Sequence, residues 1–229
     1  VEDLSRAIEL EPDNFWNYLD RGRIRLRLGM MEKALQDFTR AIELNPDNFF
    51  PYAYRAGIYD QMEKTDKALA DYETIVELRE DYYFAYSALG TLYYMKTQWI
   101  DAAVAYGKAF MHEDDMFPYA MFSAACMYRG GKEKEGKTYL QEVISSIPKE
   151  SIYYHLMRLY LDKKYETNLI TKIEAMTDKR QKGEALFFLA LFYHLQGERR
   201  LAKIYFLEVT ELAAPESIEH RLASWEIEE

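Results

Sequence analysis

The chain has 229 residues, a formal net charge of −10 and one cysteine, Cys126. The acidic balance argues against a nucleic-acid-binding surface, which needs a basic stripe, and a single cysteine excludes an intrachain disulfide. Hydrophobic residues make up 49% of the chain, yet no stretch has the roughly 20 unbroken apolar residues of a transmembrane helix. We therefore expect no nucleic-acid partner and no transmembrane segment in this chain.

A framework of similar residues recurs along the chain with a period of 34 residues, and residues 15–48 show it best. This segment has aromatic residues at positions 4 and 24, small residues at positions 8, 20 and 27, and proline at position 32. These residues are Tyr18, Phe38, Gly22, Ala34, Ala41 and Pro46. The register continues without insertion through residues 49–82, 83–116 and 117–150. A period of this length indicates stacked helical repeats rather than a single globular core.

The framework resembles the tetratricopeptide repeat (TPR), a helix-turn-helix unit. The resemblance implies an all-α fold, a right-handed TPR superhelix (α-solenoid) of about six helix-turn-helix repeats plus a C-terminal capping helix. The predicted segments are a truncated repeat at 1–14, TPRs at 15–48, 49–82, 83–116 and 117–150, a divergent TPR at 151–182, a TPR at 183–216 and a capping helix at 217–229.

Turn and cap residues recur in the same register. Gly29, Gly131 and Gly197 stand at position 15, where the first helix of a repeat must end, and glycine adopts the left-handed conformation there at little cost. Aspartate recurs at position 33, where a short polar side chain can cap the first helix of the next repeat. The predicted caps are Asp13, Asp47, Asp81 and Asp115.

Charged residues at positions 7 and 23 occur together or not at all. Arg21 accompanies Asp37, and Arg55 accompanies Asp71. The third repeat has Leu89 and Ala105 at these positions instead. The pattern predicts an ion pair between the two helices of each of the first two full repeats.

The framework weakens after Ser151 and recovers from Gly183. The second helix of the divergent repeat is expected to be short, at about residues 166–176, and residues 177–182 are expected to form a polar connection. Ser217 is expected to cap a last helix whose outer face is acidic. Such a helix would cover the open end of the stack.

This end of the chain also resembles, over fewer than fifty residues, the C-terminal part of bacterial NlpI-type TPR lipoproteins. The likeness rests on Glu219, His220, Arg221, Ala223, Glu226 and Ile227. It favours the bacterial envelope or periplasm over the cytoplasm. Because the chain begins inside a repeat, we expect an N-terminal targeting segment to be missing from it.

No residue pattern indicates catalysis. The four histidines lack partners at metal-ligand spacing, and the chain has neither an HExxH sequence nor a nucleophile motif. The run from His112 to Asp115 is interpreted as solvated residues at a helix end rather than as a metal cluster. We therefore expect no catalytic residue, no cofactor and no metal site in a chain that is not an enzyme.

In TPR proteins the first helices of the repeats line a concave groove, mainly through positions 2, 5, 6, 9, 12 and 13. Here these positions lack the Lys-Asn-Asn clamp that holds C-terminal carboxylates in some TPR proteins, and many are apolar. The predicted partner-binding groove consists of Trp16, Leu19, Phe50, Tyr54, Phe84, Tyr94, Met95, Met121, Phe122, Tyr128, Leu156, Leu159, Phe187, Phe188 and Leu191.

An exposed apolar groove of this kind predicts a scaffold or adaptor that binds a peptide or a partner helix. Two alternatives stay open: a structural homo-oligomer that pairs through the same surface, and burial of the apolar residues within the stack. Replacement of Phe84, Tyr94 and Phe122 by aspartate is expected to abolish partner capture while the chain stays folded.

Overall fold

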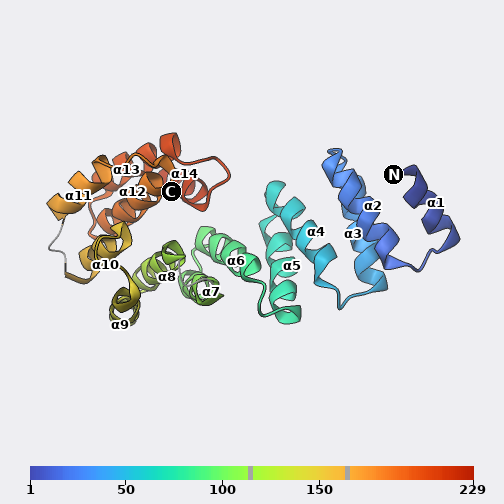
Figure 1. The fold of residues 1–229 in the computed structure, drawn as a ribbon, viewed down its shortest axis with the longest axis horizontal. Helices are drawn as coiled ribbons and strands as arrows, with labels where there is room; N and C mark the ends of the chain where they lie inside the picture. Colours follow the sequence, from blue (N-terminus) through green and yellow to red (C-terminus); the bar gives the residue numbers. More distant parts are fainter. Residues whose placement is uncertain (113–115, 163–165) are drawn as a thin grey trace. The chain divides into compact units, whose positions relative to one another are not determined.

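The computed structural model describes residues 1–112, 116–162 and 166–229. Over these residues the fold is all-α, with helices that follow one another in antiparallel pairs (Figure 1). The chain divides into two compact units, the N-terminal unit Val1–Leu89 and the C-terminal unit Gly90–Glu229. The two units are described separately below.

The N-terminal unit contains α1 (Glu2–Leu10), α2 (Phe15–Arg27), α3 (Met31–Leu44), α4 (Phe49–Gln61) and α5 (Thr65–Leu78), and α6 (Tyr83–Met95) contains the boundary. The C-terminal unit continues with α7 (Trp99–His112), α8 (Phe117–Arg129), α9 (Glu133–Val143), the 3-10 turn η1 (Ile144–Ser146), α10 (Ile152–Asp162), α11 (Glu166–Glu174), α12 (Lys179–Leu195), α13 (Arg199–Leu212) and α14 (Ile218–Glu228). Residues 177–182 were expected to form a polar connection. The connection is shorter, because Asp178 caps α12 and this helix begins at Lys179.

Two of the helix pairs bring a glycine against an aromatic ring. A Cβ atom at Gly22 would lie 2.7 Å from the Phe38 ring, and one at Gly90 would lie 2.8 Å from the Tyr106 ring. The turns within the pairs also follow the predicted geometry, since the three glycines at position 15 have φ between 72° and 81°. Glu63 and Thr97 adopt the same left-handed conformation at the equivalent positions without being glycine.

Two of the helix caps lie one residue later than predicted. Asn14 accepts a hydrogen bond from the backbone N–H of Trp16 (3.2 Å), and Asn48 accepts one from Phe50 (3.0 Å). Their predecessors Asp13 and Asp47 are exposed. The predicted cap Asp81 accepts a hydrogen bond from the Arg79 guanidinium (2.9 Å), and Asp115 lies outside the described residues.

The predicted ion pairs of the N-terminal unit are confirmed. The Arg55 guanidinium donates to both carboxylate oxygens of Asp71, at 2.8 and 2.7 Å. Arg21 binds Asp37 in the same way, at distances from 2.8 to 3.3 Å. Each arginine also reaches the preceding repeat, since Arg55 Nη1 donates to the Thr39 hydroxyl at 3.2 Å. The pair therefore links both the two helices of a repeat and two successive repeats.

The core of the C-terminal unit is built around α12. This helix is buried from Gly183 to Tyr193, so its whole circumference is covered rather than one face. The Phe122 ring of α8 lies 5.3 Å from the Phe187 ring and 4.8 Å from the Phe188 ring, measured between centroids. The Tyr160 hydroxyl of α10 donates to the Phe188 carbonyl at 2.8 Å. The first helices of successive repeats thus pack directly on one another.

The last helix closes the C-terminal unit onto its first helix. Ser217 caps α14, as predicted, by accepting from the His220 N–H at 3.2 Å. Near the other end of α14, Glu226 accepts from the Tyr94 hydroxyl and from the Arg129 guanidinium, and Arg129 also donates to the Tyr94 oxygen at 2.7 Å. We call Tyr94, Arg129 and Glu226 the clasp. The Glu226 side chain is only 1% exposed, which differs from the expected acidic outer face of α14.

We expect the Arg55–Asp71 ion pair to stabilise the N-terminal unit. Replacing Asp71 by alanine leaves the Arg55 charge, 17% exposed, without its partner, and we expect a loss of about 2–4 kcal/mol in the free energy of unfolding. The double variant Arg55→Leu/Asp71→Ala should recover most of this loss, because the third repeat carries Leu89 and Ala105 there. Urea denaturation measures both effects. Glu77→Ala on the exposed face of α5 is the control, and equal losses in the single and double variants would contradict the coupling.

We expect the clasp to stabilise the C-terminal unit. Glu226→Gln removes the charge that compensates Arg129, whose side chain is 12% exposed, and should cost about 2–4 kcal/mol. Denaturation followed by tryptophan fluorescence reports on the clasp, because the Trp99 ring lies 4.0 Å from the Arg129 guanidinium. Glu228→Gln, an exposed change of the same kind on α14, is the control. Equal free energies of unfolding for Glu226→Gln and Glu228→Gln would contradict a stabilising role of the clasp.

Candidate protein-interaction surface

The predicted groove residues of the C-terminal unit lie almost entirely in its core. Tyr94, Met121, Phe122, Leu156, Leu159, Phe187, Phe188 and Leu191 are 0% exposed. Met95 and Tyr128 are half-buried at the edge of the same cluster. Here the structure differs from the open apolar stripe expected from the sequence, because α8, α10 and α12 bury these faces against each other. Aspartate at Tyr94 or Phe122 would therefore disrupt the core, unlike the expectation for a surface change.

The N-terminal unit presents its aromatic residues differently. Trp16, Phe50 and Phe84 are 50%, 46% and 57% exposed. Each is the second residue of its helix, α2, α4 or α6, and they are spaced 34 residues apart. We call these three residues the aromatic row. Of the other two predicted residues in this unit, Leu19 is buried and Tyr54 is half-buried.

The residue that precedes each member of the aromatic row anchors it. The ring centroids are 4.4 Å apart for Phe15 and Trp16, 4.3 Å for Phe49 and Phe50, and 4.1 Å for Tyr83 and Phe84. Phe15 and Phe49 are partly buried against the cores of the unit, so in these two pairs one ring is fixed and the other faces solvent. Because Asn14 and Asn48 cap the amides of Trp16 and Phe50, the first turn of each helix is fixed as well.

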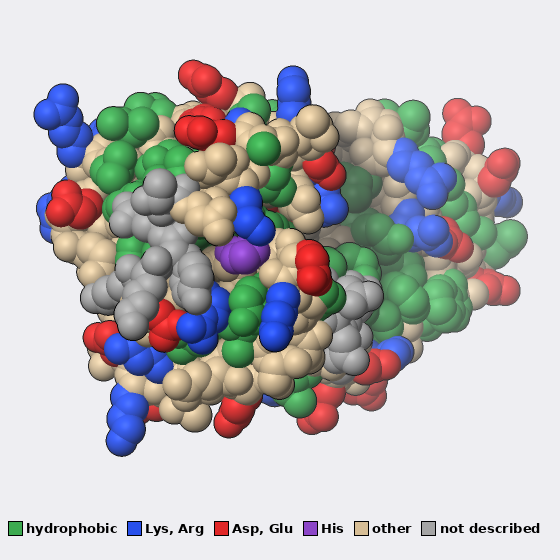
Figure 2. All heavy atoms as spheres, turned by 60° about the vertical axis from the view of Figure 1, so that its left-hand side comes forward, with side chains coloured by type: hydrophobic (Ala, Val, Ile, Leu, Met, Phe, Trp, Pro, Cys, Tyr) green, Lys and Arg blue, Asp and Glu red, His purple; other side chains and the backbone are tan. Residues whose placement is uncertain are grey.

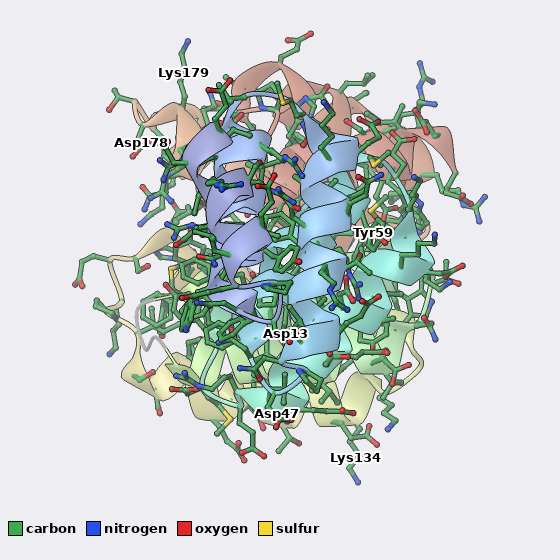
Figure 3. The ribbon with its side chains drawn as sticks, turned by 90° about the vertical axis from the view of Figure 1, so that its right-hand side faces the viewer. Asp13, Asp47, Tyr59, Lys134, Asp178 and Lys179 are labelled. Atoms are coloured by element: carbon green, nitrogen blue, oxygen red, sulfur yellow. The ribbon has the colours of Figure 1, made fainter. Side chains whose placement is uncertain are left out.

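Aromatic contacts continue from α4 to α6. The Tyr82 ring lies 5.0 Å from the Phe49 ring and 5.9 Å from the Phe84 ring, between centroids. Tyr82 therefore connects the two aromatic pairs across the loop. Asp13 and Asp47 lie at one edge of the N-terminal unit, in the loops that precede α2 and α4 (Figure 3). Acidic residues therefore precede the helices that carry Trp16 and Phe50.

Tyr54 borders the aromatic row on α4. Its ring stacks on the Phe38 ring of α3, with centroids 5.2 Å apart and planes inclined by 11°. The Arg23 guanidinium lies 5.8 Å from the Tyr54 centroid and forms an ion pair with Asp20 at 3.1 Å. At Gly57, one turn further, an added Cβ would meet nothing within 4 Å. This face of α2 and α4 therefore combines aromatic, charged and open positions.

The surface of the C-terminal unit is mixed in charge. Basic and acidic side chains are interspersed with small hydrophobic areas over the face that Figure 2 shows. Four of its side chains, Val104, Met111, Ile204 and Leu207, are large, apolar and exposed. Cys126 is fully buried, and burial raises the pKa of its thiol.

Neither a metal site nor a membrane-spanning helix is found in the described parts of the chain. No group of three or more His, Cys, Asp or Glu side chains could hold a metal ion within residues 1–112, 116–162 and 166–229. Over the same residues, no helix has the length and apolar character needed to cross a membrane. The acidic run that follows His112 lies outside the described residues.

Sequence reasoning missed the clasp. Glu226 belonged to the short stretch shared with NlpI-type proteins, and Arg129 and Tyr94 lie on other helices. Burial, and then the Glu226 charge, raise the pKa of Tyr94 well above its usual value, which keeps its hydroxyl a donor. Burial and the Arg129 charge lower the pKa of His194, which lies 3.6 Å from Glu226. Tyr94 and Glu226 are 132 residues apart in the chain, so a pattern that repeats every 34 residues does not predict that they meet.

Comparison with known proteins was made for sequence and for structure. Two tetratricopeptide repeat family models match, one at residues 18–48 and the other at residues 52–82 and 183–215. No curated protein matches the chain. The comparisons leave the likeness to NlpI-type lipoproteins as an expectation.

Several solved structures share the fold. A tetratricopeptide repeat protein from Parabacteroides merdae is 20% identical, with a TM-score of 0.57, over 99% of this chain and 90% of that chain. YrrB, described as a TPR protein with an unusual peptide-binding site, is 14% identical, with a TM-score of 0.57, over 96% of this chain and 97% of that chain. MamA is 16% identical, with a TM-score of 0.52, over 62% of this chain and 78% of that chain.

The matched segments include α2 with α3, α4 with α5, and α12 with α13, so both compact units carry the repeat. The helix pairs and turns of this chain agree with the tetratricopeptide repeat fold of the similar structures. The chain is a tetratricopeptide repeat protein, and its repeats support a protein-interaction scaffold.

Proposed function

We propose that this protein is a non-enzymatic scaffold whose N-terminal unit binds a segment of a partner protein through the aromatic row. The observation that carries the proposal is the exposure of Trp16, Phe50 and Phe84 at the same position of three successive repeats. Three large aromatic side chains held half-exposed at a fixed period are a feature of interaction surfaces rather than of a solvated face.

The row suits binding for energetic reasons. Aromatic side chains supply a large contact area with few rotatable bonds, so little conformational entropy is lost when a partner covers them. Ring contacts with Phe15, Phe49 and Tyr83 restrict their motion further, which lowers the cost of ordering the surface. Such pre-organised aromatic anchors commonly carry most of the binding free energy of an interface.

The partner that fits is a peptide or a helix with apolar side chains on one face. Arg23 and Asp20 beside Tyr54 add charged groups that can orient its polar atoms. The peptide-binding site described for YrrB, whose fold is similar, supports a peptide as the occupant. The predicted residues in the C-terminal unit contribute to its core, so the proposed surface is restricted to the N-terminal unit.

The proposal predicts selective loss of peptide binding in the variant Trp16→Ala/Phe50→Ala/Phe84→Ala. Peptides selected from a random display library on the wild-type protein should bind the variant at least about tenfold more weakly, because the aromatic anchors are lost. Fluorescence anisotropy of the labelled peptides measures the change. Thermal unfolding of the variant should stay close to wild type, because the replaced rings are about half-exposed.

The matched control is Met111→Ala/Ile204→Ala/Leu207→Ala, which removes exposed apolar side chains from the C-terminal unit. It should leave peptide binding unchanged. Peptides that bind the row variant as well as the wild type would refute the row as the binding site. A dimer in light scattering that dissociates only in the row variant would replace the peptide with a second copy of the chain.

A further inference from the structure

A pocket of about 350 Å³ lies beside the clasp, entirely within the C-terminal unit. Its volume is in the range of small-molecule sites in proteins. The residues that define its chemistry come from the start of α7, the end of α8, the face of α13 and the end of α14. They are Trp99, Arg129, Arg199, Lys203, Phe206 and Trp225. None of these residues belongs to the predicted groove or to the aromatic row.

The pocket gathers positive charge in a chain whose net charge is −10. Arg199 and Lys203 stand four residues apart on α13 and therefore share one face of the helix. The Lys203 ammonium donates to the Ile227 carbonyl at 3.2 Å, a contact that leaves its charge uncompensated. Within the described part of the chain, Arg199 forms no ion pair with a carboxylate.

Two acidic residues, Glu226 and Glu229, also line the pocket. Glu226 is already bound by Arg129 and Tyr94 in the clasp, with its side chain 1% exposed. Glu229, the other acidic residue of the lining, follows the end of α14 and is exposed. The first turn of α13 has no acidic residue, and the N-cap residue Glu198 makes no side-chain hydrogen bond to the helix amides.

Part of the pocket wall is aromatic. The Trp99 and Trp225 rings meet edge to face, with centroids 6.4 Å apart. Phe206, from the same helix as the two cations, adds a third ring. A strongly hydrated inorganic anion would gain nothing from such walls, whereas an anion attached to an apolar group would use both features.

We propose that this pocket binds a carboxylate carried on an apolar group about the size of a phenyl ring. Arg199 and Lys203 bind the carboxylate, and Trp99, Trp225 and Phe206 surround the apolar group. A free organic acid and the C-terminal residue of a peptide share this chemistry. The site lies within the C-terminal unit, so it is independent of peptide binding by the N-terminal unit.

Intrinsic fluorescence tests the proposal directly. The chain has three tryptophans, and Trp16→Phe leaves only Trp99 and Trp225, both in the pocket lining. In this variant of the 229-residue chain, 3-phenylpropanoate should change the fluorescence saturably, with a Kd of about 1–10 mM for so small a ligand. The neutral 3-phenylpropanamide should bind at least about tenfold more weakly, because it lacks the charge that Arg199 and Lys203 recognise.

Variants of α13 separate this site from a general charge effect. Arg199→Gln and Lys203→Gln should each weaken binding of 3-phenylpropanoate by about fivefold or more. Arg200→Gln makes the same change of charge at the next residue, which is exposed and outside the lining, and should leave the Kd unchanged. Equal weakening by Arg199→Gln and Arg200→Gln would overturn the proposal.

Two further probes identify the source of the carboxylate. N-acetyl-Ala-Ala-Phe with a free carboxylate binds more tightly than 3-phenylpropanoate if the occupant is a peptide end, and no more tightly if it is a free acid. Either result supports the site. The absence of saturation below about 50 mM acid, equal binding of acid and amide, or preferential binding of inorganic phosphate would each refute it.

Discussion

The close approach of two helices at a residue without a large side chain is the contact on which this structure depends. Gly22 against Phe38 and Gly90 against Tyr106 leave no room for even a methyl group without movement of the ring. Interiors packed at this density transmit such a constraint directly to neighbouring side chains. Once the helix pair is fixed in this way, its other positions are free to vary without loss of the repeat.

The two units use that freedom differently. In the N-terminal unit, Arg21 and Arg55 connect helices through buried ion pairs, and successive repeats are linked by hydrogen bonds to Ser5 and Thr39. In the C-terminal unit the residues of the first helices are mostly apolar and pack on α12. Ion pairs fix a geometry at a single point, whereas apolar faces attract every available apolar surface. This difference accounts for an exposed aromatic row in one unit and a closed core in the other.

The repeat period predicted what depends on local spacing. The turns at Gly29, Gly131 and Gly197 and the pairs formed by Arg55 and Arg21 follow from residues that share a register, and the structure contains them. The caps show the limit of the same reasoning, because Asp13 and Asn14 are both good capping residues. Only the dihedral angles of the loop decide which side chain meets the helix amides.

Burial could not be predicted in the same way. A period of 34 residues places Phe122 and Trp16 on the first helices of their repeats and states nothing about how far the helices curve over them. Whether a face is covered depends on contacts between residues far apart in the chain, such as Tyr94 with Glu226. The buried acid Glu219 is a second example: burial and the nearby Glu184 charge raise its pKa to about 7, although in sequence it belongs to an acidic terminal helix.

The surfaces of the two units depend on different kinds of contact, local in one unit and between distant residues in the other. In a solenoid each repeat contacts only its neighbours, so an exposed face stays exposed whatever happens further along the stack. The aromatic row has this property, because Asn14, Asn48 and the preceding rings that fix it are all local. The pocket beside Trp99 and Trp225 does not, since it exists only while α14 is held against α6 and α8 by Glu226. A site made from both ends of a unit therefore responds to anything that loosens the clasp, while a surface made from one turn of each helix does not.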